Sequence, residues 1–279
     1  MKIRLLVAGA IAALACSGTA QAHRQWMLPS STVLSGTDSW VTVDAAVSND
    51  LFYFEHFPMS TDDIAVIRPD GSAGQIENAA KGRYRSTFDV HLTQPGTWRI
   101  ARDTTGVMGS YMLNGKRERL PRGTTKATLA KAIPAGATDV QTTESLGRNE
   151  IFVTLGAPTT TVFKTTGAGL EMMPVTHPND LVSGEAATFQ FLLDGKPASG
   201  LKVTVIPGGI RYRDALGQMD LTTGADGKLS VTWPEPGMYW LNASVGGGGE
   251  GGPGEGQGAN AATPQRRASY TTTLEVLAP

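Results

Sequence analysis

The amino-acid sequence predicts an all-β protein made of two β-sandwich domains in tandem. Three observations support this prediction. Short runs of alternating apolar residues recur along the chain, glycine, proline and aspartate separate them, and 279 residues are enough for two domains with a core each. One weak helical pattern, over 125–133, interrupts the β pattern and is expected to lie on a connection.

The first 22 residues have the pattern of a secretory signal peptide. Lys2 and Arg4 give a positive start, an apolar run covers 5–15, and an Ala-Gln-Ala cleavage site ends at Ala22. Cleavage there makes His23 the first residue of an exported chain. We therefore predict a periplasmic protein with a free amine on His23.

A second processing site competes with this one. Cys16 lies in the sequence Leu-Ala-Cys-Ser, which resembles the site at which bacterial lipoproteins are cut and lipidated. Ala13 is smaller than the residue such sites favour, so the cut after Ala22 fits better. Lipidation of Cys16 would leave His23 inside the chain, with its amine converted to an amide.

The first sandwich is expected to cover residues 23–165. Its strands are expected where apolar residues alternate, at 40–45, 64–67, 84–92, 98–101 and 151–155. The Pro-Asp-Gly sequence at 69–71 and the Thr-Gln-Pro-Gly sequence at 93–96 supply turns between them.

The second sandwich is expected to cover residues 170–279. Its strands are predicted at 189–193, 201–205, 229–233, 239–245 and 270–277. An Asp-Gly-Lys-Pro turn follows the first of these strands, because glycine tolerates positive φ and proline presets its own. Residues 246–258 hold nine glycines and are expected to protrude without regular structure.

Composition excludes several classes of protein. Removing Lys2 and Arg4 from the 24 basic residues leaves 22 against 25 acidic ones, which gives no basic field for nucleic acid. No long apolar run follows the signal, so we expect no transmembrane segment in the exported chain. Cys16 is the only cysteine, which excludes disulfides, thiol catalysis and thiolate metal sites after cleavage.

A short basic run lies at 116–122, with the sequence Lys-Arg-Glu-Arg-Leu-Pro-Arg. Such runs usually form solvated loops. The alternative is a surface that meets an anionic polymer or a membrane.

Four histidines carry the functional hypothesis. Once the signal is removed, His23 offers a metal both its α-amine and its ring, and neutral imidazole is the commonest metal ligand in proteins. His56 ends an apolar aromatic run, and His91 shares a strand face with Asp89. We predict a metal site made by His23, His56 and His91 at one rim of the first sandwich.

Other groups are candidates for supporting roles at this site. Glu55 and Asp89 are alternative ligands or hydrogen-bond partners of the ligands, and His177 joins them if the second domain folds back. Nitrogen ligands without thiolate suit nickel, cobalt, copper or zinc, and affinity order alone favours copper. Four methionines are possible soft copper ligands, although their usual role is packing: Met27, Met59, Met172 and Met173.

Five segments of the chain have the pattern of a known family: the start His-Arg-Gln-Trp-Met-Leu-Pro at 23–29, and the segments 174–184, 191–198, 225–227 and 236–240. In these segments the chain resembles a bacterial periplasmic family of unknown function, many of whose members are described as periplasmic components of cobalt or nickel uptake. The Gly-Lys-Pro and Asp-Gly turns also occur in transthyretin-like and carboxypeptidase-regulatory-like sandwiches, so the second domain is expected to be of this kind.

The resemblance implies a non-enzymatic accessory that binds nickel or cobalt for an envelope metal-uptake transporter. Two other hypotheses are open. One is a metal-free envelope adhesion or scaffold module. The other is a copper-dependent oxidative enzyme, because lytic polysaccharide monooxygenases also combine an N-terminal histidine with a second histidine on a sandwich.

Overall fold

The computed structural model describes residues 23–246 and 265–279 and confirms the all-β fold class. The predicted signal peptide lies outside the described residues, as does all of the predicted glycine-rich excursion except Gly246. Among the described residues no helix is long and apolar enough to cross a membrane.

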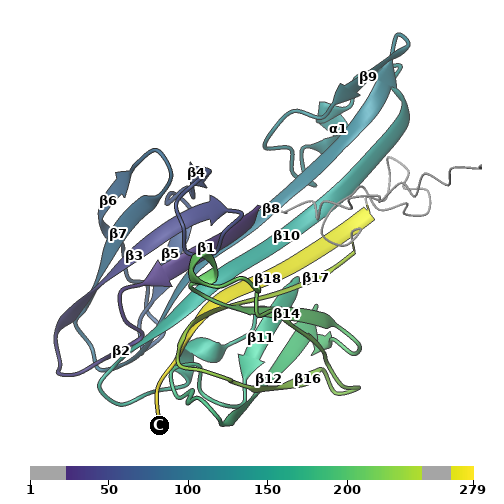
Figure 1. Ribbon diagram of the computed structural model, residues 1–279. Helices are drawn as coiled ribbons and strands as arrows, with labels where there is room; N and C mark the ends of the chain where they lie inside the picture. The colour runs from purple at the N-terminus through teal and green to yellow at the C-terminus, as the bar shows by residue number, and fades with distance from the viewer. Residues whose placement is uncertain (1–22, 247–264) are drawn as a thin grey trace, which may run out of the picture.

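Three sheets make up the fold (Figure 1). The five-stranded sheet has the order β1 (Arg24–Pro29), β3 (Ser39–Ser48), β7 (Ser86–Leu92) and β6 (Glu77–Lys81), with β4 (Phe57–Pro58) also paired to β3. The nine-stranded sheet has the order β15 (Met219–Thr222), β14 (Lys202–Pro207), β17 (Gly237–Val245), β18 (Gln265–Val276), β10 (Thr138–Leu155), β8 (Gly96–Leu113) and β5 (Ile64–Ile67). Two short strands pair with the ends of inner strands of this sheet, β2 (Val33–Leu34) with β10 and β9 (Lys116–Arg119) with β8. The four-stranded sheet contains β11 (Leu170–Pro174), β12 (Ala186–Leu193), β13 (Lys196–Pro197) and β16 (Lys228–Thr232).

The first sandwich packs the five-stranded sheet against the nine-stranded one. Alternation along β3 buries Val41, Val43 and Ala45, and β7 adds Phe88 and Val90 to the same core. The nine-stranded sheet contributes apolar residues of β8 and β10 to the same core: Trp98, Ile100, Ile151 and Val153. Burying large apolar side chains in this way contributes about 1.5–3 kcal/mol each.

The second sandwich packs the four-stranded sheet against the other face of the same nine-stranded sheet. Phe189, Phe191 and Trp233 meet Tyr239 and Tyr270 in its core. The pairs Phe191–Tyr270 and Trp233–Tyr239 lie edge to face, with ring centroids 5.9 and 5.1 Å apart.

The two sandwiches therefore share their middle sheet. Sequence periodicity predicted two sandwiches that divide between 165 and 170, but it did not reveal this sharing. Strand β10 pairs with the last strand β18 in parallel register, Thr143 opposite Gln265 through Glu150 opposite Thr272. Successive side chains of β10 point to opposite faces, so Ile151 and Val153 enter the first core while Phe152 enters the second.

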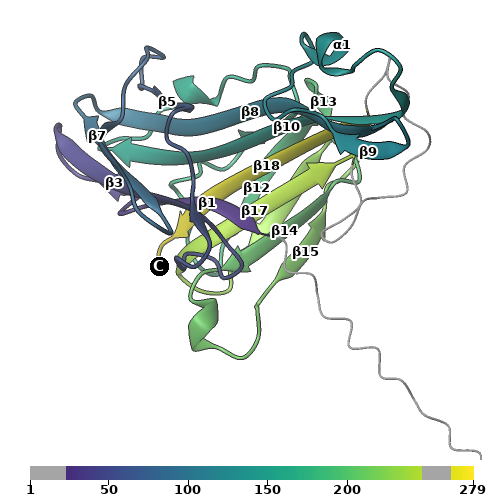
Figure 2. The same ribbon diagram turned by 90° about the horizontal axis from the view of Figure 1, so that it is seen from above.

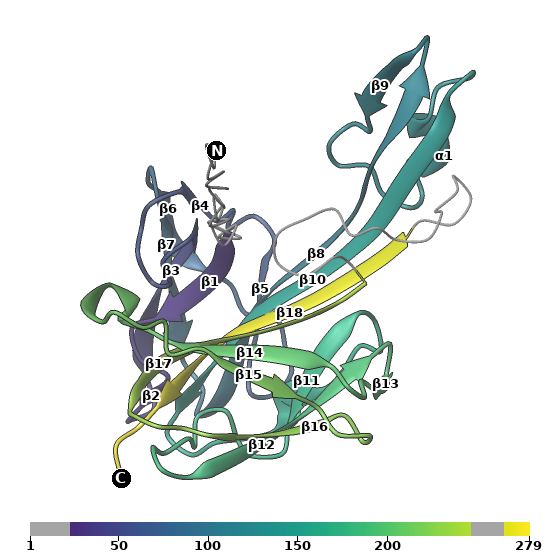
Figure 3. The same cartoon turned by 45° about the vertical axis from the view of Figure 1, so that its right-hand side comes forward.

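The strands β8 and β10 continue beyond both sandwiches as an arm (Figures 2 and 3). The arm carries β9 and the single-turn helix α1 (Leu129–Ala132), which falls inside the segment with the weak helical pattern. It has a small core of its own, made by Val107, Tyr111, Leu120 and Leu129. Two 3₁₀ turns complete the described structure, η1 (Thr161–Phe163) and η2 (Ile210–Tyr212).

Candidate functional site

The first described strand is anchored at several points, and these anchors fix the position of His23. The Arg24 Nη1 donates to the carbonyl oxygen of Asn49 at 2.7 Å, and the Trp26 indole donates to Ser48 Oγ at 2.8 Å. From the second sandwich, the Trp240 indole donates to the Gln25 carbonyl at 3.1 Å.

The loop between β3 and β4 positions His56 beside His23. One oxygen of Glu55 accepts hydrogen bonds from the backbone amides of Asn49 and Asp50, at 2.7 and 2.8 Å, and so closes the turn after β3. Phe52 adopts a φ of 60°, a strained value for a bulky residue, and packs its ring against Trp26. Strand β4 then pairs with the end of β3 and holds the chain directly after His56.

His23 and His56 come together at this end of β3. Their ring centroids are 4.4 Å apart in an edge-on arrangement, and Phe57 lies 5.8 Å from His23. The His56 ring is half-buried, and its Nε2 is shielded from solvent without a hydrogen-bond partner. A shielded ring nitrogen without a partner is uncommon in a folded protein, because losing its hydrogen bonds to water is costly.

Two polar atoms of nearby residues in the chain are in the same condition, because Arg24 Nε and Asn49 Oδ1 are also buried without partners. The Arg24 guanidinium lies over the Trp240 ring, 5.9 Å from its centroid, in different surroundings from the histidine rings. Of these three unpartnered atoms, His56 Nε2 is the one that belongs to the histidine pair.

The predicted carboxylate neighbour Glu55 is already engaged, because its Oε1 accepts two backbone amides. Among the described residues no group of three or more His, Cys, Asp or Glu side chains could hold a metal ion. A metal at the histidine pair would therefore take its third protein donor from the backbone, such as the α-amine that signal cleavage would create on His23.

The structure does not bring His91 to this pair. On one side of β3 Arg24 is opposite Ser48, whereas on the other side His91 is opposite Trp40. Trp40 and Ser48 are eight steps apart along β3, a distance of about 26 Å. His91 instead stacks on Trp40, with centroids 4.1 Å apart and planes 6° from parallel, and its Nε2 lies 3.1 Å from Asp38.

Asp89 and His177 also lie in other surroundings. Asp89 accepts hydrogen bonds from Thr42 and Asn78, at 2.7 and 2.9 Å, and these bonds lower its pKa. His177 Nε2 lies 3.0 Å from Thr97 Oγ1, and burial lowers the pKa of this histidine.

Sequence patterns gave no sign of the aromatic residues behind the histidine pair. Trp26 and Trp240 pack together with Leu51, and the partly buried Phe52 and Phe54 cover them. Nothing in the sequence links Trp240 to a site that lies 215 residues away. Two of the possible soft ligands are unavailable, because Met27 and Met59 are buried in the first core.

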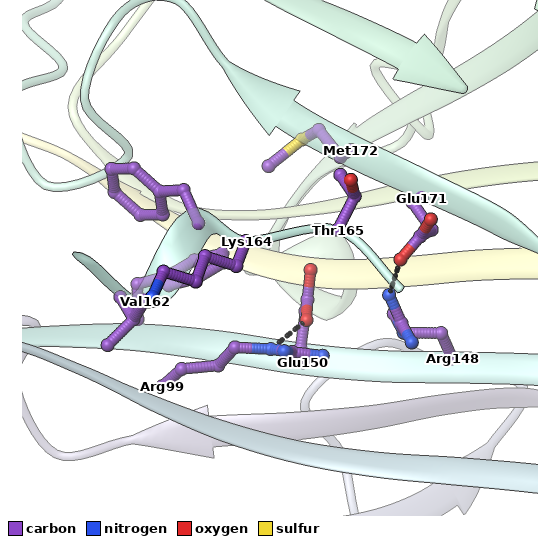
Figure 4. A pocket seen from close by; sticks show the side chains of 10 residues that line it. Arg99, Arg148, Glu150, Val162, Lys164, Thr165, Glu171 and Met172 are labelled. Carbon is purple, nitrogen blue, oxygen red and sulfur yellow. Dashed lines mark hydrogen bonds and ion pairs between the residues drawn. The ribbon is translucent and has the colours of Figure 1, made fainter. Parts of the chain in front are cut away.

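A second polar cluster lies between the nine-stranded and four-stranded sheets (Figure 4). Glu150 accepts hydrogen bonds from Arg99 Nε at 2.5 Å and from the Tyr270 hydroxyl at 2.7 Å. Arg148 donates to Glu171 at 2.5 Å and to Asp103 at 2.8 Å. The cavity beside these groups is about 10 Å³, room for one water molecule, so the cluster is structural.

Comparison with solved structures gives only distant similarity. A DUF4785 family protein from Legionella pneumophila is 9% identical and aligns over 78% of this chain and 50% of its own, with a TM-score of 0.24. The trypsin-activated alpha-2-macroglobulin from Escherichia coli is 12% identical over 91% of this chain and 16% of its own, with a TM-score of 0.22. The D0-D1 domain of intimin is 11% identical over 90% and 97%, with a TM-score of 0.20. This chain thus spans about half the length of the Legionella protein.

Comparison of sequences is more specific. No curated protein matches the chain. A family profile described as a domain of unknown function matches residues 20–247, which is most of the sequence. The chain therefore belongs to the DUF4198 family of domains of unknown function.

Proposed function

We propose that this protein binds a divalent transition-metal ion through His23 and His56, as a periplasmic accessory to metal uptake. The observation that carries the proposal is the contact between the two rings, whose centroids are 4.4 Å apart. The Nε2 of His56 is shielded from solvent there and has no hydrogen-bond partner. An imidazole nitrogen in this condition is available to a metal, since it has no hydrogen bond to lose.

The donor set suits an ion that must be released again. Two ring nitrogens and the α-amine of a processed His23 give three nitrogen ligands and leave other coordination positions open. Nickel or cobalt as the ion, and an envelope transporter as the recipient, rest on the family resemblance. Affinity order alone favours copper for such a set.

Calorimetric titration of the chain that begins at His23 tests the proposal with nickel, cobalt, copper and zinc in turn. We expect one ion per chain, with affinity that falls as pH decreases through the histidine range because protons compete for the same nitrogens. H56A should weaken binding at least 100-fold, since even residues that only support a ligand cost about 10–100-fold. An alanine added before His23 should also weaken it, because the amine becomes an amide.

H91A is the matched control, because it removes a histidine of β7 that lies opposite the far end of β3. Equal affinities for H56A and the unchanged protein would contradict the proposal. A melting temperature that no divalent ion changes would favour the metal-free adhesion or scaffold role.

The same donors leave one enzymatic alternative. An N-terminal amine, its own ring and a second histidine are the copper ligands of lytic polysaccharide monooxygenases, and the half-exposed Phe57 lies beside His23. Oxygen consumption by the copper-loaded protein with a reductant would support this activity, and its absence would leave binding alone.

A further inference from the structure

The arm has two faces of different character. Side chains of β8 alternate, so Val107 and Tyr111 enter the arm core while Met108 and Met112 point to the opposite face. Residues directly opposite each other on paired strands share a face, so the pairing of β9 with β8 shows on which face each residue of β9 lies.

The arginines of β9 lie on the face away from the arm core. Arg117 is opposite Met112, Arg119 is opposite Ser110, and Arg117 Nη1 donates to Ser110 Oγ at 3.0 Å. Glu118 lies on the core face, where its carboxylate is 3.4 Å from the Tyr111 hydroxyl. The single acidic residue of β9 is thus separated from its two arginines.

Strand β18 adds a third arginine at the base of this face. Ser145 is opposite both Gly106 and Arg267, which puts Arg267 on the face of Met108. We call Met108, Met112, Arg117, Arg119 and Arg267 the arm face. Its arginines are exposed, and Met108 is 61% exposed between them.

The charge of the arm face is only partly neutralised. Asp139 pairs with Arg117, while Arg119 and Arg267 make no ion pair with any residue the structure describes. Residues 104–143 carry six basic and two acidic side chains, whereas the whole chain has a formal net charge of −1. The positive potential is therefore local to the arm.

We propose that the arm face binds the phosphate headgroups of an anionic membrane surface. Guanidinium groups match phosphate oxygens bidentately, and clusters of basic residues are attracted to anionic lipid. The arm extends past both sandwiches, so neither sandwich covers it from a flat surface that approaches its end (Figure 3). The exposed Met108 supplies an apolar side chain between the arginines for the headgroup boundary. This inference is independent of the metal site.

Co-sedimentation of the chain 23–279 with vesicles tests the inference. We expect binding to vesicles of phosphatidylcholine with phosphatidylglycerol, weakening as salt is added, and no binding to phosphatidylcholine alone. The double variant R119Q/R267Q should bind about 25-fold more weakly, since each basic residue near such a surface contributes about fivefold. M108S should weaken binding without changing its dependence on salt.

The double variant K81Q/R83Q is the matched control, because it removes two exposed charges from the β6–β7 hairpin of the first sandwich. Melting temperatures confirm that all variants fold. Equal binding by R119Q/R267Q and the control, or equal binding to both kinds of vesicle, would overturn the proposal. Binding to poly-glutamate but not to vesicles would also overturn it and would indicate an acidic polypeptide partner.

Discussion

The cluster around Glu150 and the histidine pair at the end of β3 both withdraw polar side chains from water. Around Glu150, the carboxylates and guanidinium groups that meet between the sheets have partners. At the histidine pair, His56 Nε2 has none. A complete network holds two sheets together, whereas an incomplete one leaves capacity for a ligand.

The largest effect should follow from breaking the complete network. We expect E150A to lower the free energy of unfolding by about 3–5 kcal/mol, because it leaves the partly buried Arg99 guanidinium and the buried Tyr270 hydroxyl without a partner. Urea unfolding followed by tryptophan fluorescence measures this loss. A change below 1 kcal/mol would contradict the role we give the cluster, and metal affinity should stay unchanged.

Acid should weaken the same cluster by a smaller amount. Burial alone would raise the pKa of Glu171, but hydrogen bonds from the Thr166 and Gly167 amides and from Arg148 outweigh it and lower the pKa below 4.5. A depressed folded-state pKa contributes stability above the ordinary pKa, and this contribution is lost as pH falls through the folded value.

The urea midpoint should therefore decrease as pH falls below 4.5, the ordinary pKa of a glutamate. The variant E171Q has no carboxylate to take up a proton as pH falls, so its midpoint should depend less steeply on pH. Parallel curves for the two proteins would show that Glu171 does not contribute.

The smallest effect on stability should come from the incomplete site. H56A removes a half-buried side chain whose Nε2 has no partner, so we expect a change of less than about 1 kcal/mol in the metal-free protein. Thermal unfolding of both proteins without metal measures it. A loss as large as that of E150A would mean that His56 is a structural residue.

Local patterns were enough to predict much of the fold. The strand predicted at 64–67 coincides with β5, and that at 40–45 lies within β3. Alternation failed to reveal β1, and it did not show that β8 and β10 extend into an arm, because their outer halves are polar and contain glycines. Pairing of β10 with β18 joins segments about 120 residues apart, and no local pattern encodes it.

The candidate site was predictable only in part, for a related reason. The two-residue repeat of a β-strand correctly placed His91 on the same strand face as Asp89. It could not show at which end of the sheet His91 lies. His56 follows an aromatic run that packs behind β1, and this packing brings it to His23. The missing partner of His56 Nε2 is a result of three-dimensional packing, and no sequence pattern indicates it.

The place of β18 in the middle sheet constrains the order in which the protein can form. Strand β18 lies between β17 and β10, so the shared sheet stays divided until residues 265–276 have been made. Strand β1, which begins directly after His23, is held by Trp240, so it reaches its final position only after residue 240 has been made. Contacts between such distant segments slow folding. The anchor that Trp240 gives to β1 is therefore missing from a growing chain until residue 240 has been made, and the histidine pair at the start of β1 lacks this support until then.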